Sequence, residues 1–195
     1  GHAYQIACTR AQLGEDCAVA AVMSGHWVQG GRPAIADKWT RTKLALLGGA
    51  DLVLELPTVW AVSSAETFAR GAVELLAAAQ VVDVLSFGSE CGDADKLRRA
   101  AICLNSPEYE AGLRRFVEGG TPFAAARQRA VEGLLGPELA ELLSTPNNNL
   151  GVEYIRALDR LNHEIRPMTI RREGAPHDSL LLGTERPRFC SATQL

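Results

Sequence analysis

The chain has 195 residues, 47% hydrophobic and 22% charged, so it can bury one substantial core, and no apolar stretch is long enough to cross a bilayer. The net charge of −3 excludes a whole-molecule positive field, so any nucleic-acid contact must come from local basic patches. The five cysteines are scattered without a CxxC pair, which argues against a disulfide framework or a metal site and favours a reducing cytoplasm.

The first eighty residues alternate between short apolar strands and amphipathic helices. Gly48 and Gly49 close one helix, and Pro57 stops the strand that follows it. The expected elements are a helix over residues 3–13, a strand over 16–23, a helix over 37–47, a strand over 52–56 and a helix over 65–79.

The second half of the chain continues this alternation and then becomes purely helical. Asp93 can cap a helix after the third strand, and glycines at 119–120 and 136 divide the helical stretch into two or three pieces. The expected elements are a strand over 82–87, a helical insertion over 107–145, a polar turn over 146–149, a helix over 151–161, a strand over 165–170 and a mobile loop over 171–188.

Strands that alternate with helices predict an α/β fold with one main domain, a Rossmann-like parallel sheet with right-handed crossovers and helices on both faces. Ligands of such sheets bind beyond the C-terminal ends of the strands. The turns at 24–26 and 88–90, and whatever precedes Gly1, should therefore share one cleft. Residues 20–43 run from a strand through a Gly-rich turn into a basic helix start, which indicates that this cleft binds a nucleotide.

The helix start at 38–43 carries three cations where the helix dipole favours acids. Lys38 and Arg41 are candidates for contacting an anionic ligand such as a phosphate, and Lys43 is interpreted as surface. A solvated helix face is the competing interpretation and stays open. A hydrolase is rejected, because Ser24 and His26 lack both an acid at suitable spacing and a G-x-S-x-G elbow.

Seven ordered blocks, colinear over nearly the whole chain, resemble the bacterial tRNA(Met) cytidine acetate ligases of the HIGH-type nucleotidyltransferase superfamily. Together they are far more specific than any one alone. The blocks are Met-Ser-Gly-His (23–26), Pro-Ala-Ile-Ala-Asp-Lys-Trp-Thr-Arg-Thr-Lys (33–43), Asp-Leu-Val-Leu-Glu-Leu-Pro (51–57), Phe-Ala-Arg-Gly (68–71), Phe-Gly-Ser-Glu (87–90), Pro-Asn-Asn (146–148) and Ser-Ala-Thr (191–193).

The resemblance implies a nucleotidyltransferase core over residues 1–195. Family members begin with a strand and a His-x-Gly-His loop, so Gly1 and His2 correspond to the second half of that loop, without the first strand. Family members also continue past the Ser-Ala-Thr motif into a C-terminal region that this chain lacks. The resemblance therefore implies a core truncated at both ends.

The activity implied by the resemblance is ATP-dependent ligation of acetate to N4 of the wobble cytidine of elongator tRNA(Met). The implied route passes through acetyl-adenylate and releases pyrophosphate and AMP. The implied partners are ATP, acetate and elongator tRNA(Met), with no membrane; a requirement for Mg²⁺ stays open. Two alternatives also remain, namely a HIGH-type enzyme that adenylylates a small metabolite and a non-catalytic fragment.

At the start of the chain, His2 could donate to a phosphate at a helix N-terminus, and Gly1 would let the nucleotide approach the backbone. A frayed chain end is the competing interpretation. Gly88 matches the family glycine that passes close to adenine or ribose; an ordinary αL turn is its alternative. With the resemblance, His2, Lys38 and Arg41 are the candidate catalytic residues. The resemblance also implies that Lys38 and Arg41 contact acetate, phosphate or the tRNA backbone.

The remaining candidates for binding ATP lie in the second half of the chain. Asn147 and Asn148 could recognise an adenine edge or form a plain turn, and Glu90 could accept from ribose or cap its own helix. Arg172 matches the family's Arg-x-Gly segment, with Arg171 as its nearest rival, and would bind phosphate. Ser191 and Thr193 resemble the C-terminal phosphate-binding turn of the superfamily.

Two segments depart from the family pattern: residues 29–32 carry Gly and Arg where relatives have Arg and an acid, and residues 176–178 lack an aromatic residue before His-Asp. Contacts to acetate and tRNA are therefore less clearly implied than contacts to ATP. Basic residues of the helical stretch could follow RNA phosphates, although the acids among them favour solvated helix faces. These residues are Arg98, Arg99, Arg114, Arg115, Arg127 and Arg129.

Overall fold

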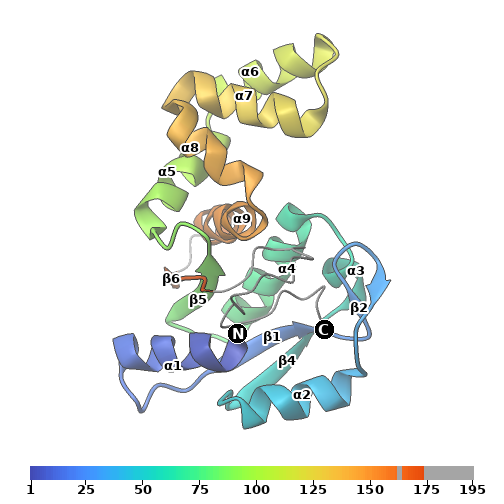
Figure 1. The fold of residues 1–195 in the computed structure, drawn as a ribbon, viewed down its shortest axis with the longest axis vertical. Coiled ribbons are helices and arrows are strands. Elements are labelled where there is room, and N and C mark those ends of the chain that lie inside the picture. The colour runs from blue at the N-terminus through green and yellow to red at the C-terminus, as the bar shows by residue number, and fades with distance from the viewer. Residues whose placement is uncertain (162–163, 174–195) are drawn as a thin grey trace, which may run out of the picture. The chain divides into compact units, whose positions relative to one another are not determined.

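The structure is a computed structural model that describes residues 1–161 and 164–173. The chain divides into two compact units, whose helices and strands are labelled in Figure 1. Unit 1 contains Gly1–Gln80 together with residues 172–173, and unit 2 contains Val81–Arg171. The predicted mobile loop over 171–188 lies outside the described residues from residue 174 onward.

Unit 1 contains a parallel strand pair linked through a helix. Strand β1 (Ala20–Ser24) pairs with β4 (Leu52–Leu56), in a register that runs from Ala20 opposite Leu52 to Ser24 opposite Leu56. Helix α2 (Lys38–Leu47) lies between them in sequence, and the Asp37 carboxylate caps it by accepting from two backbone N–H groups. This pairing is the parallel β-α-β arrangement that the sequence predicts.

The predicted strand over 16–23 begins four residues too early. The backbone N–H of Val19 donates to the Asp51 carboxylate over 2.7 Å. This N–H is therefore bound to a side chain and not to the backbone of a neighbouring strand. Arg10 binds the same carboxylate over 2.8 Å. This contact between distant parts of the sequence fixes where the chain enters β1.

Unit 1 also contains a short antiparallel ribbon that the sequence analysis does not predict. Strand β2 (Trp27–Val28) pairs with β3 (Arg32–Pro33). Gly30 and Gly31 form the turn with φ of 83° and 72°, values that favour glycine. The Gly-rich segment between β1 and α2 is therefore the tip of a hairpin.

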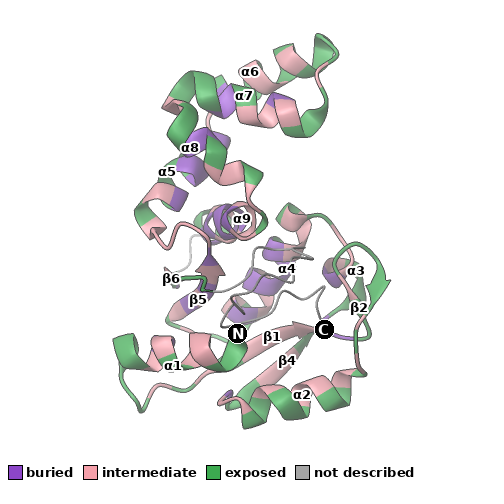
Figure 2. Cartoon of the chain, viewed as in Figure 1, coloured by how far each residue is buried: buried purple, intermediate pink, exposed green. Residues whose placement is uncertain are grey.

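Three further helices complete unit 1, namely α1 (His2–Leu13), α3 (Thr58–Ala61) and α4 (Ala65–Ala78). Gly71 of α4 packs against Trp60 of α3, because a Cβ at Gly71 would lie 2.5 Å from the indole ring. Figure 2 shows buried residues along α4, where Ala69 and Val73 are fully buried. The short helix α3 is absent from the sequence-based prediction.

Unit 2 holds a second parallel pair. Strand β5 (Val84–Ser89) pairs with β6 (Arg166–Arg171), with Val84 opposite Arg166. Because β5 extends two residues past the predicted end, Gly88 is a strand residue opposite Ile170, and the interpretation of Gly88 as an αL turn is wrong. Helix α5 (Ala94–Leu104) begins after Asp93, whose carboxylate caps it as predicted.

The helical stretch divides at the predicted glycines. It contains α6 (Pro107–Glu118), α7 (Phe123–Leu135), α8 (Pro137–Glu141) and the 3-10 helix η1 (Leu142–Ser144). These helices belong to the same unit as α5 and the long helix α9 (Pro146–Leu161). A separate insertion over 107–145 stays a prediction.

The predicted polar turn over 146–149 is wrong, because these residues form the first turn of α9. Pro146 suits this position, since the first helical N–H has no partner inside the helix. At the next turn, Gly151 lets α9 approach β5, where a Cβ would lie 2.7 Å from Phe87. An α/β fold with parallel strands is therefore confirmed, while the joining of the two pairs into one sheet stays a prediction.

Candidate active site

The N-terminus of α1 lies within a positively charged cluster in unit 1. His2 is the first residue of the helix and Gly1 is its N-cap, with the Gln5 N–H donating to the Gly1 carbonyl over 3.1 Å. The pKa of His2 is lowered from 6.5, first by desolvation and then by the positive charges of the N-terminal amine, Arg172 and Arg41. His2 is nevertheless exposed at its surface, so a ligand can reach it.

These positive charges come from three distant parts of the sequence. The sequence analysis names His2, Arg41 and Arg172 separately, and the structure brings both arginines within electrostatic reach of His2. We call this group the basic cluster. Cations beside free helix N–H groups favour a bound anion such as phosphate.

Arg41 is held in place by the turn that follows β1. Its Nη1 donates to the Ser24 carbonyl over 2.9 Å and to the Gly25 carbonyl over 2.6 Å. In both described hydrogen bonds of this half-buried guanidinium, Nη1 is the donor. A guanidinium fixed in this way keeps further donors for a ligand.

Lys38 has a different environment from Arg41. Its Nζ donates to Glu55 Oε2 over 2.7 Å and lies 5.1 Å from the centroid of the Trp39 ring. The ion pair with Glu55 offsets the charge of Lys38. The role of Lys38 in catalysis stays a prediction.

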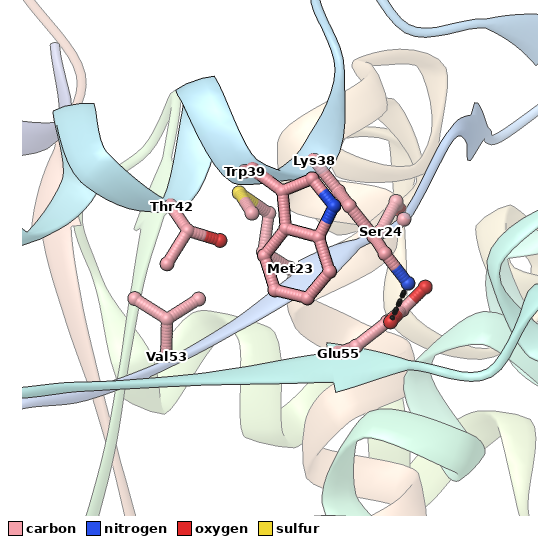
Figure 3. Close-up of a pocket in the computed structure, with 8 residues that line it drawn as sticks. Met23, Ser24, Lys38, Trp39, Thr42, Val53 and Glu55 are labelled. Carbon is pink, nitrogen blue, oxygen red and sulfur yellow. Dashed lines mark hydrogen bonds and ion pairs between the residues drawn. The ribbon is translucent and has the colours of Figure 1, made fainter.

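Glu55 and Trp39 line a pocket that the sequence analysis does not assign. The pocket measures about 110 Å³ and lies between α2 and the ends of β1 and β4 (Figure 3). We call it the Glu55 pocket; its walls include Met23, Ser24, Lys38, Trp39, Val53 and Glu55. The signal in the sequence is a single acid, Glu55, within the apolar strand 52–56.

Gly25 lets the Glu55 carboxylate occupy this position. A Cβ at Gly25 would overlap Glu55 Oε1, so any larger residue would displace the carboxylate. The structure thus gives a physical reason for a glycine directly after β1. Figure 3 shows Glu55 on β4 facing Lys38 from α2, with the ion pair as a dashed line.

In unit 2, the loop after β5 is bound to the start of α9. The Glu90 carboxylate accepts from the Asn147 side chain over 2.7 Å and from the Asn148 backbone N–H over 2.7 Å. Burial alone would raise the pKa of Glu90, but these hydrogen bonds outweigh it and the pKa is lowered from 4.5. Glu90 therefore caps α9, and the interpretation that it caps its own helix is wrong.

Asn148, in the first turn of α9, is almost fully buried against the same loop. Its Oδ1 accepts from the Cys91 N–H over 3.0 Å, and its Nδ2 donates to Thr145 Oγ1 over 2.6 Å. The described hydrogen bonds of Asn147 and Asn148 are thus made to residues of unit 2. Recognition of adenine by these two residues stays a prediction.

The two arginines after β6 have different surroundings. Arg171 lies under Gly92, where a Cβ would come within 2.6 Å of the Arg171 Cβ; the φ of Gly92 is 64°. Arg172 belongs to unit 1 and adds to the charge at His2. This difference favours Arg172 over Arg171 as the phosphate ligand.

Several predicted residues lie outside the described part of the chain, namely Ser191, Thr193, Cys190 and residues 176–178. The four described cysteines are free thiols. Within the described ranges, His, Cys, Asp and Glu form no group of three or more that could hold a metal ion.

The arginines proposed to follow RNA phosphates include several that are paired within unit 2. Arg98 lies 3.7 Å from Asp159, and Arg114 lies 3.2 Å from Glu110. Arg127 is bound to the buried Glu153, which Arg156 also contacts over 2.8 Å. These pairs favour a structural role for Arg127, since removing one partner would leave the Glu153 charge buried.

The family model of the HIGH nucleotidyl transferases matches residues 1–195. The chain belongs to this family. None of the described helices is long and apolar enough to span a membrane.

Among its relatives, this HIGH nucleotidyl transferase is 47% identical to the tRNA(Met) cytidine acetate ligase of Caldanaerobacter subterraneus subsp. tengcongensis, over 91% of this chain and 44% of the relative. It is 43% identical to the enzyme of the same name from Thermoanaerobacter sp. strain X514, over 100% of this chain and 48% of the relative. The chain thus spans about half the length of these curated relatives, and the predicted resemblance to them is confirmed.

Two solved structures of Thermotoga maritima TmcAL share the fold at 38% sequence identity. The apo form has a TM-score of 0.89 and covers 99% of this chain and 46% of that chain. The form bound with alpha-thio ATP has a TM-score of 0.86 and covers 99% of this chain and 45% of that chain. Both confirm the predicted α/β nucleotidyltransferase fold.

Proposed function

We propose that this chain forms the nucleotide-binding part of a ligase that attaches acetate to N4 of the wobble cytidine of elongator tRNA(Met), using ATP. The observation that carries the proposal is the basic cluster, in which the charges of Arg41 and Arg172 act on His2 at the N-terminus of α1. The tRNA(Met) cytidine acetate ligases among the relatives support the choice of substrates, and the alpha-thio ATP bound to TmcAL supports ATP.

The first step activates acetate, because a carboxylate is a poor electrophile. A carboxylate oxygen of acetate attacks the α-phosphorus of ATP and forms a new P–O bond. The bond to the bridging oxygen breaks, so pyrophosphate leaves and acetyl-adenylate remains. Such a step needs positioning and positive charge around the phosphate oxygens more than covalent help from the protein.

The second step transfers the acetyl group. The exocyclic amine of cytidine attacks the acetyl carbonyl and forms a C–N bond. The C–O bond to the phosphate then breaks, AMP leaves with that oxygen, and the amine loses a proton. This step requires an unpaired cytidine at the adenylate, as the anticodon loop of a tRNA provides.

The basic cluster suits the first step. A neutral His2, favoured by its lowered pKa, can donate one ring N–H to a phosphate oxygen. Arg41 and Arg172 add guanidinium donors, and the first N–H groups of α1 add the helix dipole. Gly1, Gly88, Asn147, Asn148, Ser191 and Thr193 are proposed to complete the ATP site, and acetate is proposed to bind beside Arg41.

ATP is a substrate in this proposal. We propose that any Mg²⁺ required binds through the phosphates of ATP. The reaction uses tRNA and ATP, so we propose a cytoplasmic protein. No described residue is assigned to a metal.

Labelled acetate tests the proposal. The full-length protein is incubated with ATP, labelled acetate and elongator tRNA(Met), and the label on the RNA is measured. We expect label on the RNA only when ATP is present. AMP transfer to a small metabolite without acetate would instead indicate the alternative nucleotidyltransferase, and absence of ATP binding would indicate a non-catalytic protein.

A further inference from the structure

We propose that the Glu55 pocket receives the target cytosine ring, with Glu55 accepting a hydrogen bond from its exocyclic amine and Trp39 stacking on its face. This inference rests on the proposed function and adds a recognition site for the base. The pocket volume of about 110 Å³ is below the roughly 300–1,000 Å³ of drug-sized ligand pockets, so it suits a single small ring.

The charge of the pocket disfavours an anion. Lys38 is its cation, and Glu55 neutralises it over 2.7 Å. An acetate or phosphate would meet the Glu55 carboxylate here, whereas several positive charges gather at the basic cluster. A neutral ligand with a hydrogen-bond donor fits the pocket better.

The Glu55 carboxylate can accept such a donor. A carboxylate has about four lone-pair positions on two oxygens, and Lys38 occupies one of them on Oε2. The side chain remains 45% exposed, so a ligand can reach it. Among bases, the amine of cytosine is the usual donor to a Glu carboxylate, while uracil presents an acceptor at the same position.

Trp39 supplies an aromatic surface beside this acceptor. The residue is 71% exposed, although a tryptophan is large and usually well buried. The Asp37 carboxylate accepts from its backbone N–H over 2.9 Å, so the ring is presented from a capped helix start. Stacking on an aromatic side chain is a common way in which proteins hold an unpaired RNA base.

The pocket shares one turn with the basic cluster. Ser24 and Gly25 line the pocket, and their carbonyls bind Arg41. A cytosine in the pocket would therefore lie across this turn from the acetyl group of a bound adenylate. The same short segment would position both reactants.

Binding of two RNA hairpins to the full-length protein tests the inference. The probes are fluorescent anticodon stem-loops of elongator tRNA(Met) with cytidine or uridine at the wobble position. Wild-type protein should bind the cytidine hairpin roughly ten- to hundredfold more tightly. In E55Q this ratio should shrink about tenfold, because the Gln amide can donate to the uracil oxygen.

The control is E15Q, an exposed acid in the turn after α1, which should keep the wild-type ratio. A second pair, W39A and W39F, tests stacking: W39A should weaken binding of both hairpins and W39F should restore most of it. Equal binding of both hairpins to wild type, or an unchanged ratio in E55Q, would overturn the inference. The two failures are separable, because the hairpins are scored by binding and the proposed function by labelled acetate on tRNA.

Discussion

At the scale of single residues, the charges at the end of β1 differ in what they can bind. Arg41 and His2 lie in a cluster with excess positive charge, whereas Lys38 is neutralised by Glu55. Sequence position predicts the first two, because a residue at a helix start after a strand lies near the ligand side of an α/β sheet. The pairing of Lys38 with Glu55 was not predictable, since it depends on how α2 packs beside β4.

The pKa of His2 should respond to ATP. Without ligand the pKa lies below 6.5, first because burial desolvates the ring and then because the positive charges of the cluster disfavour another one. Bound phosphate would offset the cluster and raise the pKa. An NMR titration of the ring, with H2Q to identify the signal, measures both states, and an unchanged pKa at saturating ATP would contradict phosphate binding at this residue.

The same pKa makes stability depend on pH. Because the folded pKa is lowered, the unfolded chain binds more protons as the pH falls through 6.5, and the folded state loses stability there. Replacing His2 by Gln should remove this loss. The free energies of unfolding of wild type and H2Q, measured in urea, should therefore change in parallel with pH above 6.5, and H2Q should lose less stability in acid. The same pH dependence in both proteins would contradict the lowered pKa of His2.

At the scale of elements, the strand pairs and most helices follow from periodicity and capping, as Asp93 and α5 illustrate. The predicted start of α9 is wrong because Pro146 and three asparagines resemble a turn, while the cap comes from the distant Glu90. The predicted start of β1 is wrong for a similar reason, since Asp51 binds the Val19 N–H. Contacts between distant residues decided both boundaries.

The cap from Glu90 should contribute to stability in a pH-dependent way. Its lowered pKa means that the contribution is present above pH 4.5 and is lost as the pH falls through the folded pKa. E90Q should lower the free energy of unfolding at neutral pH by about 1–2 kcal/mol, after allowance for partial exposure. Urea unfolding at neutral and acid pH measures this, with E110Q as the exposed control; a loss that persists in acid would speak against the cap.

The contact between α3 and α4 requires a glycine. An added Cβ at Gly71 would lie 2.5 Å from Trp60, so G71A should lower the free energy of unfolding by about 1–3 kcal/mol. G133A is the matched control within a helix, because nothing lies within 4 Å of its added Cβ. Thermal unfolding should rank G71A well below G133A, and equal midpoints would show that the contact is loose.

At the scale of the whole molecule, the candidate site residues are divided between two units. Unit 1 holds the basic cluster and the Glu55 pocket, and unit 2 holds the β5 loop locked by Glu90 and Asn148. The α/β class was predictable because strand and helix periodicities alternate along the chain. One cleft shared by the turns at 24–26 and 88–90 stays a prediction. The alternation of strands and helices locates the strand ends in the sequence, but it does not give the distance between those ends in space.

The central claim is that the basic cluster holds ATP for attack by acetate, and the most direct measurement is exchange of labelled pyrophosphate into ATP by the full-length protein without tRNA. The account predicts exchange that requires acetate and falls about tenfold or more in R41A. K43A, an exposed lysine on the same helix, should exchange like wild type. Exchange that proceeds equally without acetate, or that survives unchanged in R41A, would contradict the account.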